Sequence, residues 1–251
     1  MGDINDSSAA IEPLITDIPK ESPRPTWPTW IEILTCSGYP TQIFLGQLLV
    51  LAGVHPVAAG GDLSPTFVFV LSFADTALLL SLIIFFIVRR GERPSAVFFG
   101  TRATGTEVVF GIGTLPGVLA LVLALTVGIQ RFLPTLHNVP DNPLEGMIGG
   151  GANMWVFLML VIVAGGVREE LQRAFLLHRF RDDLGVPWLG LIITSMAFGM
   201  GHTLQGLDAA IITGALGATW GVMYLTRGSA LAPMVSHALF NSGELLRAFL
   251  R

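Results

Sequence analysis

Phe67–Val88 reads FVFVLSFADTALLLSLIIFFIV and contains a single charged side chain, that of Asp75. An α-helix rises about 1.5 Å per residue, and the hydrocarbon core of a bilayer is about 30 Å thick. About 20 consecutive apolar residues are therefore enough to cross a membrane. This stretch predicts a transmembrane helix.

Six other stretches share this apolar, nearly uncharged character. They are Ile43–Gly60, Val108–Ile129, a run from Ala152 into Arg168–Arg173, Val186–Leu207, Ala209–Thr226 and Gly228–Leu250. The run Thr29–Tyr39 is shorter and contains Glu32, so we expect it at the membrane interface; it is where an eighth span would lie. The predicted fold is an all-α, multi-pass transmembrane bundle of about seven spans, or eight with this run.

Composition supports the same class. The chain is 52% hydrophobic and 13% charged, whereas a soluble domain is about 25% charged. With one Lys and scattered arginines, nothing indicates binding to nucleic acid, so the expected partners are membrane lipids and a protein or peptide substrate. Cys36 is the single cysteine, which excludes an internal disulfide framework and a Cys-rich metal site.

The chain divides into three parts by composition. Residues 1–30 are polar and proline-rich and predict a disordered tail, residues 31–145 hold the first spans, and residues 146–251 hold the polar clusters described below. With seven spans, the tail and loops on the N-terminal side of the membrane contain nine basic residues, and those on the other side contain three. Excess Lys and Arg mark cytoplasmic loops, so we expect a cell-membrane protein with a cytoplasmic N-terminus.

Three polar clusters lie in the C-terminal apolar stretches: REELQR at residues 168–173, FGMGH at 198–202 and HALFN at 237–241. An ionisable side chain at membrane depth costs about 2.5–3.5 kcal/mol on insertion scales, so such residues are functional-site candidates by default. The isolated Asp75 is expected to bond a neighbouring helix, with a proton path as the other interpretation.

Helix geometry relates the residues within each cluster. His237 and Asn241 are four positions apart and share one helix face, so they can converge on one oxygen atom. Arg173 lies four positions after Glu169 and three after Glu170, and can neutralise either acid. The two glutamates point about 100° apart, so at most one should face a given pocket.

These residue types suit hydrolysis. A carboxylate, Glu169 or Glu170, can accept a proton from water that a histidine positions. A second histidine and an amide could donate hydrogen bonds to the oxyanion that forms at the attacked carbonyl. Equally, Glu169, His202 and His237 could hold a divalent metal such as zinc, and the sequence leaves these two versions open.

In order and spacing, the clusters resemble the CAAX protease and bacteriocin-processing (CPBP) family, which includes the type II CAAX prenyl endopeptidases. That family has a double-Glu motif followed by Arg, then Phe-x-x-x-His, then His-x-x-x-Asn or Asp, on membrane helices. Phe198 to His202 and His237 to Asn241 fit these patterns. The resemblance covers about residues 150–245 and implies an intramembrane endopeptidase, in a family often labelled as metalloproteases.

One spacing departs from the family pattern, which is Glu-Glu-x-x-x-Arg, because this chain has Glu-Glu-x-x-Arg. If Arg173 is the motif arginine, the family's catalytic Glu falls on Arg168 and its second Glu on Glu169. If the Glu pair is the anchor, the catalytic residue is Glu169. We prefer Glu169, since an arginine cannot act as a base, with Glu170 as the alternative.

The resemblance implies roles for individual residues. Glu169 and His202 would activate water, His237 and Asn241 would bind the oxyanion, and Arg173 and Phe198 would support them. The best-known substrates of the family are membrane-associated prenylated CAAX proteins. Two other functions remain open: an inactive membrane scaffold or bacteriocin-immunity-type protein, which the altered arginine spacing would favour, and a transporter.

Overall fold

The computed structural model describes residues 26–58, 60–140, 142–144, 147 and 154–250, and the description below concerns these residues. Its elements are helical and are joined by turns and loops. The N-terminal helices are α1 (Trp27–Thr35), α2 (Tyr39–Leu51), α3 (Pro65–Arg89), α4 (Pro94–Phe98) and α5 (Thr104–Phe132). The C-terminal helices are α7 (Met154–Leu160), α8 (Glu169–His178), α9 (Pro187–Met200), α10 (Leu207–Arg227) and α11 (Leu231–Phe249).

Short helical segments connect several of these. A π-helix, η2 (Val161–Arg168), joins α7 to α8, and a second, η3 (Arg179–Asp183), follows α8. The 3₁₀ segments η1 (Pro134–Leu136) and η4 (Thr203–Gln205) follow α5 and α9. π-Helical turns are rare and often occur at functional sites, and η2 ends at the residue before Glu169.

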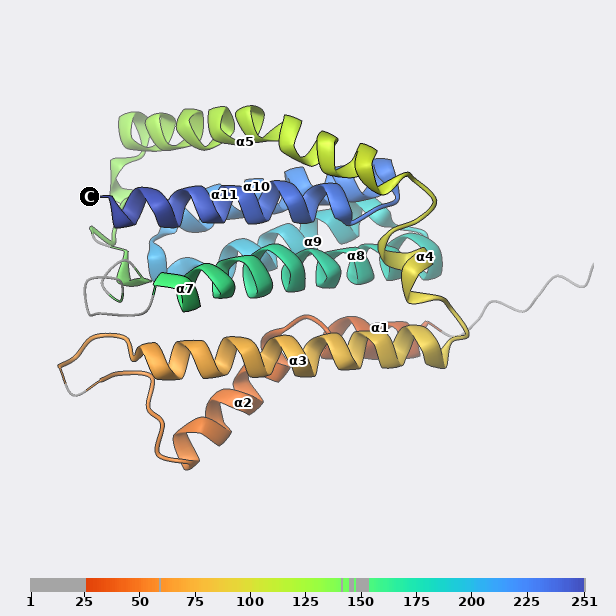
Figure 1. Ribbon diagram of the computed structural model, residues 1–251, viewed down its shortest axis with the longest axis horizontal. Helices are drawn as coiled ribbons and strands as arrows, with labels where there is room; N and C mark the ends of the chain where they lie inside the picture. The colour runs from red at the N-terminus through yellow and green to blue at the C-terminus, as the bar shows by residue number, and fades with distance from the viewer. Residues whose placement is uncertain (1–25, 59, 141, 145–146, 148–153, 251) are drawn as a thin grey trace, which may run out of the picture.

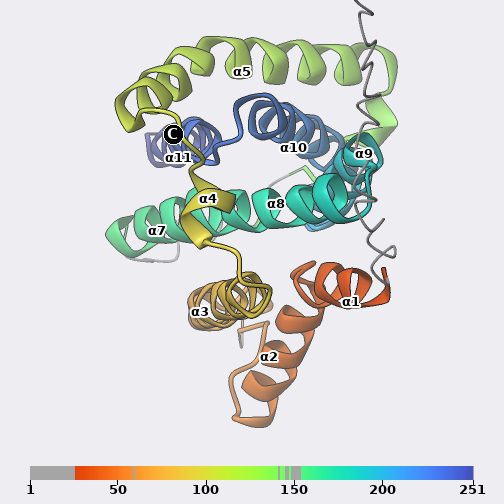
Figure 2. The same ribbon diagram turned by 90° about the vertical axis from the view of Figure 1, so that its right-hand side faces the viewer.

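The helices are arranged in layers (Figures 1 and 2). Helices α1, α2 and α3 lie on one side, the helical run α7–η2–α8 with α9, α10 and α11 forms the middle, and α5 covers the opposite side. The largest buried cluster joins α3 to α8 and includes Leu79, Ile83, Phe175 and Leu177. Each layer therefore contacts the helix that begins with the glutamate pair, either directly or through α10 and α11.

The all-α membrane fold expected from the sequence is confirmed. Helices α3, α5 and α10 are long and apolar enough to cross a membrane, and α2 and α9 are shorter apolar helices. Prolines begin several helices, as in α3 and α9, because the missing N–H of proline costs nothing in the first turn. The total of seven or eight spans stays a prediction.

Several predicted boundaries differ from the observed ones. The first span was expected to reach Gly60, but α2 ends at Leu51 because the chain turns at Gly53, which has φ +83°, ahead of Pro56. The fifth was expected to reach Leu207, but α9 ends at Met200. Of the predicted tail, residues 1–25 lie outside the described residues, whereas Trp27–Trp30 belong to α1; the predicted division at residues 145–146 also lies outside them.

A buried group of charges holds α1 against the end of the bundle. Arg179 is fully buried, and its guanidinium lies 2.7 Å from a carboxylate oxygen of Glu32 on α1 and 2.7 Å from one of Glu92 in the loop after α3. Arg90 pairs with Glu32 and with Asp183, each at 2.7 Å. Removing one member of such a group would leave an uncompensated buried charge, so these ion pairs hold α1 against the residues that follow α3 and α8.

Close contact between α5 and α11 depends on Gly111. A Cβ atom built there would lie 2.6 Å from the carbonyl oxygen of Ala232 and 2.9 Å from Cβ of Val235, whereas one built on Gly113 of the same helix would meet nothing within 4 Å. Small residues let membrane helices approach in this way. Sequence position alone does not separate these two glycines.

We therefore expect Gly111→Ala to destabilise the protein by about 1–3 kcal/mol, the usual cost of overpacking. Gly113→Ala is the matched control and should be neutral or stabilising by up to about 1 kcal/mol, because alanine is the better helix former. Thermal unfolding of both variants in one detergent measures the difference. Equal melting temperatures would contradict the close contact between α5 and α11.

Candidate active site

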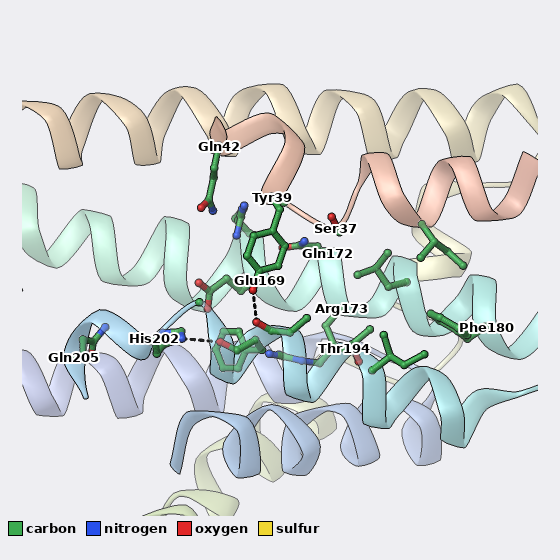
Figure 3. A pocket seen from close by; sticks show the side chains of 18 residues that line it. Ser37, Tyr39, Gln42, Glu169, Gln172, Arg173, Phe180, Thr194, His202 and Gln205 are labelled. Atoms are coloured by element: carbon green, nitrogen blue, oxygen red, sulfur yellow. Dashed lines mark hydrogen bonds between the residues drawn. The ribbon is translucent and has the colours of Figure 1, made fainter. Parts of the chain in front are cut away.

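A cavity of about 250 Å³ lies between the layer formed by α1 and α2 and the layer formed by α8 and α9 (Figure 3). Apolar side chains such as Ile33, Leu176 and Ile193 form part of its wall. Its polar and charged lining residues are Ser37, Tyr39, Gln42, Arg168, Glu169, Gln172, Arg173, Thr194, His202 and Gln205. The cavity thus contains residues from two of the three sequence clusters, together with polar residues of α2.

The two glutamates have different environments. Glu170 is 2% exposed, forms a close ion pair with Arg173 and lies 2.7 Å from Nδ1 of His237 through its Oε1 atom. Glu169 lines the cavity, and its side chain is 22% exposed. Among the described residues, the Glu169 carboxylate accepts no hydrogen bond, and its Oε2 lies 3.8 Å from Nε2 of His237. Glu170 is thus fixed by its partners, whereas Glu169 is accessible from the cavity.

His237 is held between the two glutamates. An ionised carboxylate only accepts hydrogen bonds, so Nδ1 of His237 donates to Glu170 and Nε2 faces Glu169. The ring stacks on Trp220, with centroids 3.8 Å apart and planes inclined by 16°. Trp220 in turn donates from Nε1 to Ser236, at 3.2 Å. The orientation of the imidazole is therefore fixed on its face and at its edge.

Two glycines of η2 let α11 bring His237 this close. A Cβ atom on Gly166 would lie 2.6 Å from Cβ of Ala238, and one on Gly165 would lie 2.5 Å from Nδ2 of Asn241. The backbones of η2 and α11 are therefore in close contact at Gly165 and Gly166. The Gly165-Gly166 pair is a sequence signal for this approach.

His202 lies just beyond the end of α9, within the turn before η4. Its Nδ1 lies 2.8 Å from the carbonyl oxygen of Phe198, so Nδ1 donates that bond and Nε2 is left without a proton in the neutral ring. The rings of Phe198 and His202 meet edge to face, and the guanidinium of Arg173 lies over Phe198 at 4.6 Å. Figure 3 shows His202 and Glu169 at the same end of the cavity.

The expected site residues are brought together, with one exception. Glu169, Arg173, Phe198 and His202 line the cavity, and Glu170 and His237 lie directly behind Glu169. Asn241 packs against Gly165 and is outside the set of residues that line the cavity. Its role as an oxyanion donor stays a prediction.

The expected metal-binding trio of Glu169, His202 and His237 does not form a metal-binding arrangement. Among the described residues, no group of three His, Cys, Asp or Glu side chains is placed to hold a metal ion. As placed among the described residues, this trio does not fit a metal ion.

Sequence reasoning missed the contribution of α2 and of the turn before it. Tyr39 donates from Oη to the carbonyl oxygen of Ala197 on α9, at 2.6 Å, across the cavity (Figure 3). Gln42 and Gln172 add amide groups to the lining. The polar Gln42 at the start of an apolar stretch is the available signal, since a residue facing lipid there would be apolar.

Comparison with known proteins identifies the C-terminal half of the chain. Residues 151–243 match the family model described as type II CAAX prenyl endopeptidase Rce1-like. This region is an Rce1-like domain. No curated protein and no solved structure matches the chain. The family gives the chain a general class, a CAAX-type protease of membranes, in agreement with the apolar helices.

Within the matched region, Arg173 and Arg168 have different partners. Arg173 pairs with Glu170, three positions before it. Arg168, the alternative position for the first motif residue, instead pairs with Asp75 on α3. The shorter arginine spacing therefore still gives a neutralised second glutamate and a first glutamate in the cavity.

This difference between neighbouring glutamates predicts unequal effects of their removal on stability. Glu170→Ala leaves Arg173 buried without a counter-charge, which should lower the free energy of unfolding by about 3–5 kcal/mol. Glu169→Ala removes a carboxylate that faces the cavity and should leave stability within about 1 kcal/mol of wild type. Thermal unfolding in one detergent compares them. A larger loss for Glu169→Ala would mean that the two environments are reversed.

Proposed function

We propose that the chain is an intramembrane endopeptidase in which Glu169 is the general base for hydrolysis of a peptide bond. The observation that supports the proposal is the contrast between two neighbouring carboxylates. Glu169 faces the cavity, whereas Glu170 lies buried behind it, is neutralised by Arg173 and is engaged by His237. Only the first can accept a proton from a substrate water without breaking an existing bond.

The reaction would proceed in two steps. Glu169 takes a proton from water, and the resulting hydroxide forms a bond to the carbonyl carbon of the substrate. The tetrahedral intermediate then breaks its C–N bond, and the protonated Glu169 returns the proton to the leaving amine. A nucleophilic Ser or Cys is not needed, because the peptide bond is cleaved by water itself.

The histidines would position the water. A water molecule placed against Glu169 can also donate to the unprotonated Nε2 of His237, since the 3.8 Å gap lets one oxygen lie within hydrogen-bonding distance of both. His202 offers a second unprotonated Nε2 at the same end of the cavity. When protonated, either ring could donate to the oxyanion, which is the role that the family resemblance implies for His237.

The cavity suits a peptide that arrives from the membrane surface, in particular a membrane-associated protein of the prenylated CAAX type. Apolar residues of α1, α8 and α9 share its wall with the amides of Gln42, Gln172 and Gln205, which can bond an extended backbone. Such a mixture accommodates a substrate with an apolar part and a peptide part.

We also propose a cytoplasmic N-terminus in a multi-pass arrangement. Arg90, Arg102, Arg179 and Arg227 lie near the ends of different helices, and bonds such as that from Arg102 to the carbonyl of Arg227 gather them at one end of the bundle (Figure 1). Basic residues gathered in this way mark the cytoplasmic face. Reporter fusions after residue 250 and in the loop at 91–93 test the orientation, and a cytoplasmic signal from the first with none from the second would overturn it.

The catalytic test compares wild type with Glu169→Gln in purified protein supplied with CAAX-type and other membrane-anchored peptides. Glutamine keeps the shape of the side chain but cannot act as a base, so kcat should fall by about 100-fold or more. Glu244→Gln, on the exposed end of α11, is the matched control and should cleave like wild type. Products are identified by mass spectrometry.

Two outcomes would count against the proposal. Cleavage by Glu169→Gln at the wild-type rate would exclude Glu169 as the base. Failure of folded wild-type protein to cleave any member of a broad peptide library would favour the inactive scaffold. Melting curves of each variant separate loss of activity from loss of fold.

A further inference from the structure

Asp75, in the middle of α3, has three partners from other helices. Its carboxylate accepts a hydrogen bond from Oγ1 of Thr41 at 2.5 Å and pairs closely with Arg168, and Nε2 of Gln42 lies 3.5 Å from its second oxygen. The residue is 2% exposed. A buried carboxylate in a membrane helix is costly unless it is paired, and this one is paired with both α2 and the helical run that carries Glu169.

Apolar packing does little to hold α2 in place. Thr41 is its only buried residue, while Ile43, Phe44, Leu48 and Leu51 are exposed on the outside of the described structure. Polar contacts instead fix the first turn of the helix and the loop before it. Because these bonds lie away from water, breaking one leaves a buried polar group unsatisfied.

The same turn forms a wall of the cavity. Tyr39 and Gln42 line it, as does Gly38, whose φ of +91° starts the helix. A side chain on Gly38 would lie within 3.1 Å of Gln172 and Arg168, so the loop is seated directly on α8. Nε2 of Gln172 also donates to the carbonyl of Cys36 at 2.9 Å. The position of this wall relative to Glu169 is therefore set by a few named bonds.

We propose that Asp75 is a positioning residue: through Thr41 and Gln42 it seats the first turn of α2 as the wall of the substrate cavity, opposite the helix that carries Glu169. This placement does not depend on the protein being a peptidase. Its kinetic consequence does rest on the proposed function, because a displaced wall would weaken substrate binding more than it would slow the chemical step at Glu169.

The rate at which Cys36 is chemically modified measures whether the first turn of α2 is in place, and it needs no assay of activity. It is the only cysteine in the chain and is fully buried in the turn between α1 and α2. We expect Thr41→Val to raise the rate of its modification by a membrane-permeant maleimide about five- to tenfold, the factor that one buried hydrogen bond contributes to an opening equilibrium. Asp75→Asn should do the same, and Thr41→Ser should restore the wild-type rate.

Thr76→Val is the matched control for this substitution. Thr76 is also buried and stands beside Asp75 on α3, but its hydroxyl donates within its own helix, to the carbonyl of Ser72 at 2.7 Å. Its loss should leave the labelling of Cys36 within twofold of wild type. Equal labelling of Thr41→Val and Thr76→Val would overturn the proposal.

With an active enzyme, Thr41→Val should raise KM by about the same factor and leave kcat within about twofold, again with rescue by Thr41→Ser. A lower kcat with a displaced pH profile in Asp75→Asn, while Cys36 stays protected, would instead make Asp75 a proton-path residue and overturn the positioning role. If wild type cleaves nothing but the labelling changes as expected, the peptidase proposal fails and the seating of α2 stands.

Discussion

The buried contact of Glu170 with Arg173 and His237 is the constraint on which the candidate site depends. A carboxylate and a guanidinium removed from water are tolerated only in close, hydrogen-bonded geometry. Here the pair lies within one helix, three residues apart, and the imidazole from α11 supplies the remaining bond. This arrangement fixes the rotation of α8, and the rotation of α8 points the preceding residue, Glu169, into the cavity.

Helix packing and site geometry support each other around this contact. The glycines of η2 bring α11 close enough for His237 to reach Glu170, and Trp220 of α10 covers the imidazole ring. On the other side, Asp75 and Arg168 connect α3 to the same helical run and hold α2 across the cavity. Since lipid gives no hydrophobic drive for helix association, polar bonds and close backbone contacts carry much of this positioning.

Hydropathy was enough to predict the fold class, because a membrane requires long apolar helices whatever their partners. Helices α3, α5 and α10 begin and end within a few residues of their expected limits. The boundaries that failed are those at Leu51 and Met200; the first lies just before the turn at Gly53, which an apolar count does not register.

The candidate site was predictable only in part. The spacing of the three clusters was enough to name the candidate residues. Which of Glu169 and Glu170 faces the cavity depends on the rotation of α8, which is set by contacts with Arg173 and His237. The metal trio was expected from residue type without orientation, and the described residues hold no group of three placed for a metal ion. The oxyanion role of Asn241 stays a prediction. No sequence pattern pointed to Tyr39 as a site residue, since its partner is a backbone carbonyl more than 150 residues away.

The most direct test of the central claim is an experimental structure of the Glu169→Gln variant with a substrate peptide trapped in it. If Glu169 is the base, the scissile carbonyl carbon lies within about 4 Å of the side chain at position 169, with a water or its site between them, and Glu170 remains bonded to Arg173 and His237. A peptide bound elsewhere, or with its scissile bond against Glu170, would contradict it.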